Sequence, residues 1–196
     1  MIILKTRFTP GFSFKGNMIY SDRLKIIPLT EIQLAKYLNS ISDLENELKL
    51  VHAEIDLSPD LKEAFESSIL PNSKDSNEDR LYYTLWIIID KKLNIITGGV
   101  LFTGPPNENG EIEIGYGINP EFQKMGYATE MVQLMCSWAF GQKNIKSITA
   151  KTDSGNFPSH KTLLKNQFVK VSQDETGWLW KKEKTVERKK TRHHKF

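Results

Sequence analysis

The sequence has little cysteine and no long apolar run. Cys136 is the only cysteine among 196 residues, which excludes an internal disulfide framework. No apolar stretch approaches the roughly 20 residues that a membrane-spanning helix needs. Residues 1–7 lack the basic start, apolar core and small-residue cleavage site of a secretory signal peptide. We therefore expect a cytoplasmic protein without membrane contact, and we interpret Cys136 as a buried core thiol rather than a nucleophile.

Several common cofactor and catalytic motifs are also missing. The loop near residue 125 has no Walker lysine followed by serine or threonine. Gly115 and Gly117 begin a dinucleotide-binding fingerprint, but Pro120 stands where a third glycine is needed. No Gly-x-Ser-x-Gly motif is present, and Ser159 and His160 are neighbours that cannot face each other on a helix. We expect no metal, since the histidines lack ligand spacing: His52, His160, His193 and His194.

The composition is that of a globular protein with a basic C-terminus. Hydrophobic residues make up 39% and charged residues 26% of the chain, whose length suits one domain. Residues 181–196 hold eight Lys/Arg and two Glu, whereas the remainder holds 19 Lys/Arg and 22 Asp/Glu. We predict a single domain over residues 1–182 and a flexible basic tail over 183–196. The tail is either a solvated terminus or a weak contact for RNA or the ribosome. The mildly acidic body favours a cationic substrate such as an amine.

The order of predicted elements indicates an α/β fold of the mixed α+β kind. Strand-like runs cover residues 23–29, 81–89, 95–103, 111–118, 147–152, 168–171 and 178–182. Thr30 with Gln33, and Ser42 with Glu45, are spaced as helix capping boxes, and Ser58-Pro59 begins a further helix. Helical patterns also cover residues 128–140 and 158–166. This order of one strand, helices, a three-strand meander, helix, strand, helix and hairpin predicts a mixed sheet with helices on both faces.

The loop Gln123-Lys124-Met125-Gly126-Tyr127-Ala128 joins a predicted strand to a predicted helix. The first N–H groups of a helix have no partner within it, and the helix dipole is positive there, so such a loop is suited to an anion. Gly126 lacks a Cβ where a phosphate would approach the backbone. The pattern Gln/Arg-x-x-Gly-x-Gly/Ala resembles the pyrophosphate loop of acetyl-CoA-dependent N-acetyltransferases.

The chain resembles the GNAT superfamily of N-acetyltransferases over about residues 21–182. Within it, the chain is similar to the branch of the ribosomal-protein N-terminal acetyltransferases RimJ and RimL. Three segments carry the resemblance: residues 22–30, residues 113–130 extending to Phe140, and Asn156-Phe-Pro-Ser159 with Leu163 and Phe168. The resemblance implies the GNAT fold, a mostly antiparallel sheet splayed between its fourth and fifth strands. It also implies transfer of acetyl from acetyl-CoA, the cosubstrate, to a primary amine.

The resemblance also implies the residues of the site. The expected cofactor-binding residues are Ile118, Gln123, Lys124, Met125, Gly126, Tyr127, Ala128, Thr129 and Asn156, with Gln123 bracing the loop. Glu113 is the expected catalytic base, and Glu111 shares its face of the strand; otherwise both lie on a solvated strand face. Ser159 is the expected donor to the departing thiolate; alternatively, Asn156 and Ser159 only cap the helix that follows. Asn166 is expected to adopt the left-handed conformation after that helix, because Gln167 stands at the usual glycine.

Two classes of function are open at this point. The first is direct attack of an amine on acetyl-CoA in a ternary complex. The amine is a protein N-terminus, as the branch implies, or a small molecule. The second is a non-catalytic module that binds CoA as a sensor or interaction domain. The sequence is compatible with a monomer or a homodimer.

Overall fold

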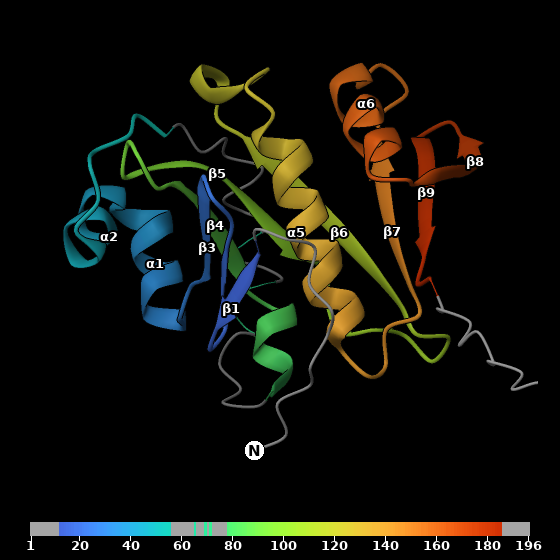
Figure 1. Cartoon of the computed structure of the whole chain (residues 1–196), viewed down its shortest axis with the longest axis horizontal. Coiled ribbons are helices and arrows are strands. Elements are labelled where there is room, and N and C mark those ends of the chain that lie inside the picture. The colour runs from blue at the N-terminus through green and yellow to red at the C-terminus, as the bar shows by residue number, and fades with distance from the viewer. Residues whose placement is uncertain (1–11, 56–64, 66–68, 70, 72–77, 186–196) are drawn as a thin grey trace, which may run out of the picture.

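The computed structural model describes residues 12–55 and 78–185, together with residues 65, 69 and 71 (Figure 1). The helix expected from Ser58-Pro59 and most of the basic tail lie outside these residues. The strands are β1 (Ser13–Lys15), β2 (Met18–Tyr20), β3 (Leu24–Pro28), β4 (Leu85–Asp90), β5 (Ile95–Phe102), β6 (Glu111–Ile118), β7 (Ser147–Thr152), β8 (Val169–Asp174) and β9 (Gly177–Glu183). The helices are α1 (Glu31–Asn39), α2 (Ile41–Leu48), α5 (Tyr127–Gly141) and α6 (Phe157–Lys165), with 3₁₀ helices η2 (Glu78–Tyr82) and η3 (Pro120–Phe122).

The strands form one nine-stranded sheet in the order β1-β2-β3-β4-β5-β6-β7-β9-β8. All neighbours are antiparallel except β6 and β7, which are parallel and paired at only three positions, ending at Glu113↔Thr149. Beyond Glu113, β6 continues to Ile118 without β7 beside it, so the two strands splay apart (Figure 1). The mixed fold with this splay is confirmed. The splayed strands are the sixth and seventh, because the short hairpin β1–β2 adds two strands that the sequence did not reveal.

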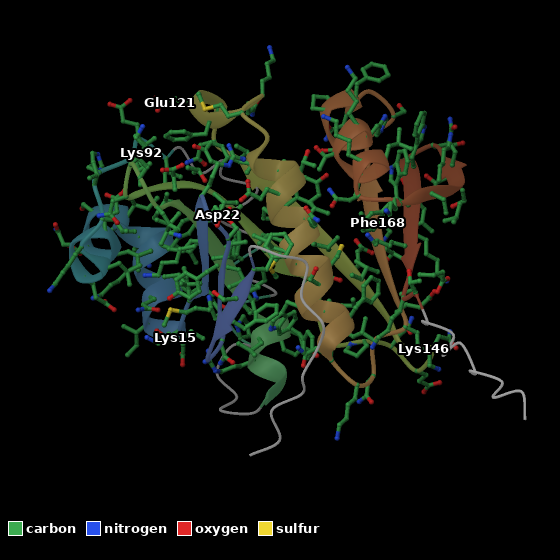
Figure 2. All side chains as sticks on the ribbon, viewed as in Figure 1. Lys15, Asp22, Lys92, Glu121, Lys146 and Phe168 are labelled. Carbon is green, nitrogen blue, oxygen red and sulfur yellow. The ribbon has the colours of Figure 1, made fainter. Side chains whose placement is uncertain are left out.

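Helices cover both faces of the sheet because the strand side chains alternate between two apolar cores. Trp86 and Ile88 of β4 point into a core with α5 and α6, which contribute residues such as Met135 and Leu163. Ile87 and Ile89 point into a second core with α1 and α2. Figure 2 shows Glu121 at the end of the molecule where β6 and β7 diverge, and Lys146 at the end where they meet.

Local capping chemistry explains where α1 and α2 begin. Thr30 and Gln33 form the predicted capping box, with each side chain bonded to the backbone of the other residue at 3.0 and 3.3 Å. The cap predicted at Ser42 is wrong, since α2 already begins at Ile41. Ser40 ends α1 and starts α2 without a side-chain cap bond, so the two helices share one boundary residue.

The strand predicted from Leu81 begins later, at Leu85. Leu81 and Tyr82 belong to the 3₁₀ helix η2. The carbonyl of Leu81 accepts a hydrogen bond from Trp86 Nε1 at 3.0 Å, which holds this turn against the start of β4. The residues predicted as one strand, 81–89, are therefore divided between the 3₁₀ helix η2 and the strand β4.

The turn after α6 differs from the expectation by one residue. Gln167 adopts the left-handed conformation with φ +65°, whereas Asn166 has φ −91°. Asn166 is buried, and its side-chain Nδ2 donates to the carbonyls of Thr129 and Thr162, both at 3.0 Å. These two bonds hold the Asn166 side chain between α5 and α6. The chain then enters β8, an edge strand whose residues are all exposed and whose pairing with β9 is irregular between Lys170 and Ser172.

Candidate functional site

The loop between β6 and α5 has the backbone of an anion-binding turn. Lys124 and Gly126 both have positive φ, at +63° and +83°. Gly126 is the N-cap of α5 and supplies no side chain to the helix N–H groups. Residues 123–126 are exposed, Tyr127 is buried, and Ala128 and Thr129 are half-buried. Residues in left-handed conformation between ordinary ones turn successive N–H groups toward one side, where they form a concavity for anions.

The amide N–H groups of residues 124–129 form no hydrogen bond with any part of the chain that the structure describes. The first bonded N–H of α5 is that of Glu130, which donates to Gly126 O at 3.1 Å. An added Cβ at Gly126 would meet only Arg23 Nη2, at 3.6 Å. The loop therefore offers a run of free donors beside a residue with no side chain, which fits a diphosphate group.

Side chains hold the loop at both ends. Gln123 Nε2 donates to Ile118 O at 3.1 Å, which is the bracing contact expected of this residue. The buried Tyr127 ring packs edge-to-face on Phe122, and its hydroxyl donates to Asp90 Oδ2 at 2.7 Å. Burial would raise the pKa of Asp90, but hydrogen bonds from the Leu93 amide, Tyr127 and the Lys92 amide hold it below its usual value. The Lys124 side chain is exposed and forms no ion pair with a described residue.

Glu113 lies where the β6–β7 pairing ends. It is opposite Thr149 in the last residue pair, and its side chain is 28% exposed. Lys151, two residues farther along β7, places Nζ 2.9 Å from Glu113 Oε2, so an ion pair spans the base of the splay. The hydrogen bond to Glu113 raises the pKa of Lys151. The expected base is thus accessible but already has a cationic partner.

Glu111 shares the face of Glu113, as the strand pattern predicted. It lies at the closed end of the splay, opposite Ser147. A hydrogen bond from Lys181 is the main cause that lowers the pKa of the Glu111 carboxyl, with a further one from Asn107. Glu111 is therefore held in a surface network rather than beside the open part of the splay.

Asn156 and Ser159 meet at the start of α6. Asn156 is the N-cap residue, and its Oδ1 accepts a hydrogen bond from the Ser159 amide at 3.2 Å. The capping role is therefore present, and it leaves the Ser159 hydroxyl available. That hydroxyl lies near the hydroxyl of Tyr116 on β6, so the structure brings α6 and the splayed part of β6 together.

Tyr116 lies on the splayed part of β6, near Ser159 and Thr162 of α6, and the sequence did not indicate this cluster. Burial raises the pKa of its phenol to about 12, and the hydroxyls of Ser159 and Thr162 oppose this rise only in part. By distance and angle, the buried Tyr116 Oη forms no hydrogen bond with a described residue. Its neighbours lie on a helix more than 40 positions later in the chain, so no local spacing could reveal the cluster.

Trp138, Trp180 and Cys136 are core residues, as was predicted for Cys136. Trp138 packs between Trp86 and Phe102, and Trp180 is 2% exposed. Cys136 is 3% exposed, and burial raises the pKa of its thiol to about 12.

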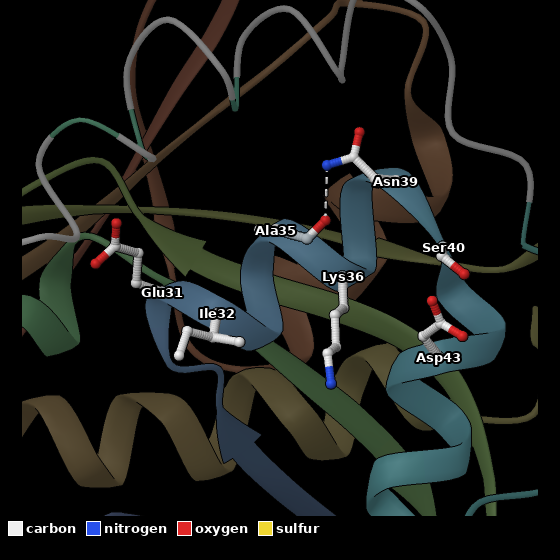
Figure 3. A pocket seen from close by; sticks show the side chains of 7 residues that line it. All are labelled: Glu31, Ile32, Ala35, Lys36, Asn39, Ser40 and Asp43. Atoms are coloured by element: carbon white, nitrogen blue, oxygen red, sulfur yellow. Dashed lines mark hydrogen bonds between the residues drawn. The ribbon is translucent and has the colours of Figure 1, made fainter.

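A pocket of about 460 Å³ lies elsewhere, against α1 and the start of α2 (Figure 3). It is lined by Glu31, Ile32, Ala35, Lys36, Asn39, Ser40 and Asp43. Some of its polar atoms already form hydrogen bonds within the protein; for example, Asn39 Nδ2 donates to Ala35 O at 2.9 Å. None of the expected site residues lines it, so it has no part in the site around β6.

Within residues 12–55 and 78–185 and the isolated residues 65, 69 and 71, no group of three His, Cys, Asp or Glu side chains is arranged to hold a metal ion. Likewise, no helix here has the length and apolarity to cross a bilayer.

Comparison with known sequences identifies a family. Residues 23–169 match the acetyltransferase (GNAT) domain family. The uncharacterized N-acetyltransferase YjdG of Bacillus subtilis is 40% identical over 84 residues, which cover 43% of this chain and 50% of YjdG. The chain thus spans about half the length of this curated relative.

Comparison with solved structures identifies the same fold. The ribosomal-protein-S5-alanine acetyltransferase of Vibrio fischeri superimposes with a TM-score of 0.60 at 19% identity, covering 85% of this chain and 96% of that one. RimL, a ribosomal L7/L12 α-N-protein acetyltransferase solved with coenzyme A, gives a TM-score of 0.58 at 15% identity, covering 83% and 95%. At these identities the likeness concerns the fold alone.

Proposed function

Because the chain belongs to the GNAT family of acetyltransferases, we propose that it transfers an acetyl group from acetyl-CoA to a primary amine. The observation that carries this proposal is the run of free amide N–H groups from residue 124 to residue 129, beside the exposed Gly126. Such donors suit the diphosphate of coenzyme A. Gln123 keeps the loop attached to the end of β6 at Ile118.

The splay between β6 and β7 supports a place for the rest of the cosubstrate. From Ile114 to Ile118, β6 pairs with β5 on one side and has no described strand on the other. An extended chain can add to such a free edge through main-chain hydrogen bonds. Asn166, the residue that ends α6, donates to the Thr129 carbonyl, so the end of α6 lies against the first turn of α5.

Glu113 is suited to receive the proton that the attacking amine must lose. An α-amine with a pKa near 8 is mostly protonated at pH 7, so a nearby carboxylate can accept its proton directly or through water. The nitrogen then bonds to the acetyl carbon, and the carbon–sulfur bond breaks. In this proposal Ser159 donates a hydrogen bond or a proton to the leaving sulfur. When an amine enters, the ion pair between Lys151 and Glu113 must break, or Glu113 must bind both cations.

A protein N-terminal α-amine is the acceptor that we favour. Two structural neighbours are named as acetyltransferases of ribosomal proteins, one of them at an α-nitrogen. A small-molecule amine is the second candidate, because the half-exposed Glu113 carboxylate would attract any small cation in competition with Lys151.

A screen for thioester turnover tests the proposal. The protein is mixed with acetyl-CoA and a panel of amines and N-terminal peptides, free CoA is measured, and the product is identified by mass. CoA at 100 times its dissociation constant should stabilise the fold by about 2.7 kcal/mol, a clear rise in melting temperature. If CoA raises the melting temperature but no acceptor releases CoA, the non-catalytic CoA-binding function replaces this one. No effect of CoA on melting would reject both.

A further inference from the structure

A polar cluster connects the loop at residues 123–126 to the opening strand of the chain. Arg23, just before β3, donates from Nε to Glu130 Oε2 at 2.8 Å and from Nη1 to Met125 O at 3.2 Å. Its guanidinium lies 5.0 Å from the centre of the Tyr127 ring. Ser21 donates from Oγ to the other carboxylate oxygen of Glu130. One side chain therefore contacts the loop, the first residue of α5 and the carboxylate in its first turn.

The bond to Met125 O controls the direction of a peptide group. In a planar trans peptide, the carbonyl of one residue and the N–H of the next point in opposite directions. Because Arg23 holds the Met125 carbonyl toward β3, the Gly126 N–H points away from β3. Gly126 has φ +83° and no side chain, so rotation of this peptide would meet little steric resistance. A rotated peptide would present a carbonyl oxygen to the anion in place of a donor.

The ion pair removes a second obstacle to an anion. Glu130 lies in the first turn of α5, where a carboxylate is favourable for the helix but repels a diphosphate at the same terminus. Arg23 and Ser21 bind both carboxylate oxygens and hold them toward the β2–β3 side. Asp90, which accepts from Tyr127, is the other carboxylate in the cluster, and its charge is also near Arg23.

We infer that Arg23 is a positioning residue for cosubstrate binding: through Met125 O it sets the orientation of the Gly126 amide toward the diphosphate. The inference rests on the proposed function, since it assigns a role within the same loop. Arg23 does not have to touch the cosubstrate. Its effect is exerted through one peptide group, and the pairing with Glu130 fixes the guanidinium in place.

Two substitutions separate this role from simple stabilisation. Arg23→Lys keeps a positive charge that can pair with Glu130, but it lacks the second nitrogen that donates to Met125 O. Because that hydrogen bond is lost, coenzyme A should bind about tenfold more weakly. Glu130→Gln leaves the bond to Met125 O possible and removes a negative charge, so coenzyme A should bind at least as tightly as to the unaltered protein. If Arg23 acted only through its ion pair with Glu130, the opposite result would follow: little loss in Arg23→Lys, which keeps the pair, and a loss in Glu130→Gln, which removes it.

The dissociation constant of coenzyme A is measured by calorimetry for each variant, with the melting temperature of the ligand-free protein recorded alongside. Arg80→Lys on η2, at the opposite end of the molecule from the loop, is the matched control and should leave binding unchanged (Figure 1). Unchanged binding in Arg23→Lys, or equal losses in Arg23→Lys and Glu130→Gln, would overturn the inference alone. Failure of the unaltered protein to bind coenzyme A would instead reject the proposed function, and the role of Arg23 with it.

Discussion

A carboxylate introduced at Gly126 provides the most direct test of the anion site. Gly126→Asp and Gly126→Asn produce side chains of nearly equal size, and both residue types tolerate the left-handed backbone better than others do. The position has φ +83°, and an added Cβ would meet only Arg23 Nη2 at 3.6 Å. Arg23 is already paired with Glu130, so the aspartate would add a net negative charge. The two variants therefore differ mainly in charge.

The size of the difference follows from Coulomb's law. Two unit charges about 4 Å apart interact by about 1 kcal/mol in water and about 4 kcal/mol near a protein surface. Gly126 is exposed, so about 1–2 kcal/mol for each phosphate charge is the appropriate range. A diphosphate carries two such charges, which gives about 2–4 kcal/mol, or a dissociation constant about 30 to 1000 times larger for Gly126→Asp than for Gly126→Asn.

Calorimetric titration with coenzyme A measures this ratio at about 50 mM and about 500 mM salt. The ratio should shrink at high salt, because the charges are screened. The same Asp and Asn substitutions at Gly141, near the C-terminal end of α5 with no atom within 4 Å of an added Cβ, form the control pair and should bind coenzyme A alike. Equal dissociation constants for the two Gly126 variants would refute the assignment of the diphosphate to this loop, and so would a ratio that salt does not change.

Three further predictions concern single side chains. Glu113→Gln should lower turnover by about 100-fold or more while the dissociation constant of coenzyme A stays within about twofold, because only proton transfer is lost; normal turnover at every pH would show that another group is the base. Asp90→Asn should flatten the acid dependence of stability measured by urea unfolding between about pH 5 and pH 2. The reason is that the pKa of Asp90 is lowered in the folded state, so its contribution is present above its unfolded pKa of about 3.9 and is lost as the pH falls through the folded value; parallel curves for variant and unaltered protein would contradict this. The Cys136 thiol, with its pKa raised to about 12 by burial, should react with a colorimetric disulfide reagent only after unfolding in urea; rapid labelling of the native protein would show that α5 opens locally.

The sequence was sufficient where the structural signal is local. The Thr30–Gln33 capping box and the strand–loop–helix unit around Gly126 both appear as predicted, within one or two residues. Each depends on side chains and backbone groups only a few positions apart. The bracing of the loop by Gln123 belongs to the same class, since its acceptor, Ile118 O, is five residues away.

Contacts between distant segments could not be predicted from spacing. Arg23 and Glu130 are 107 positions apart, and Glu113 meets Lys151 only because β6 and β7 pair in parallel after a helical crossover. The β1–β2 hairpin was missed because three-residue strands show too little alternation to be recognised. The domain limits, the cytoplasmic location, the oligomeric state and the catalytic roles of Glu113 and Ser159 stay predictions.

The irregular pairing of β8 has a consequence for solubility. A fully exposed strand at the end of a sheet offers unpaired main-chain groups to any other extended chain, and this one also exposes Val169 and Val171. The register shift between Lys170 and Ser172 bends the strand and interrupts its row of donors and acceptors. The outer strand is thereby a poor template for a tenth strand, so we expect copies of the protein not to join edge to edge at β8.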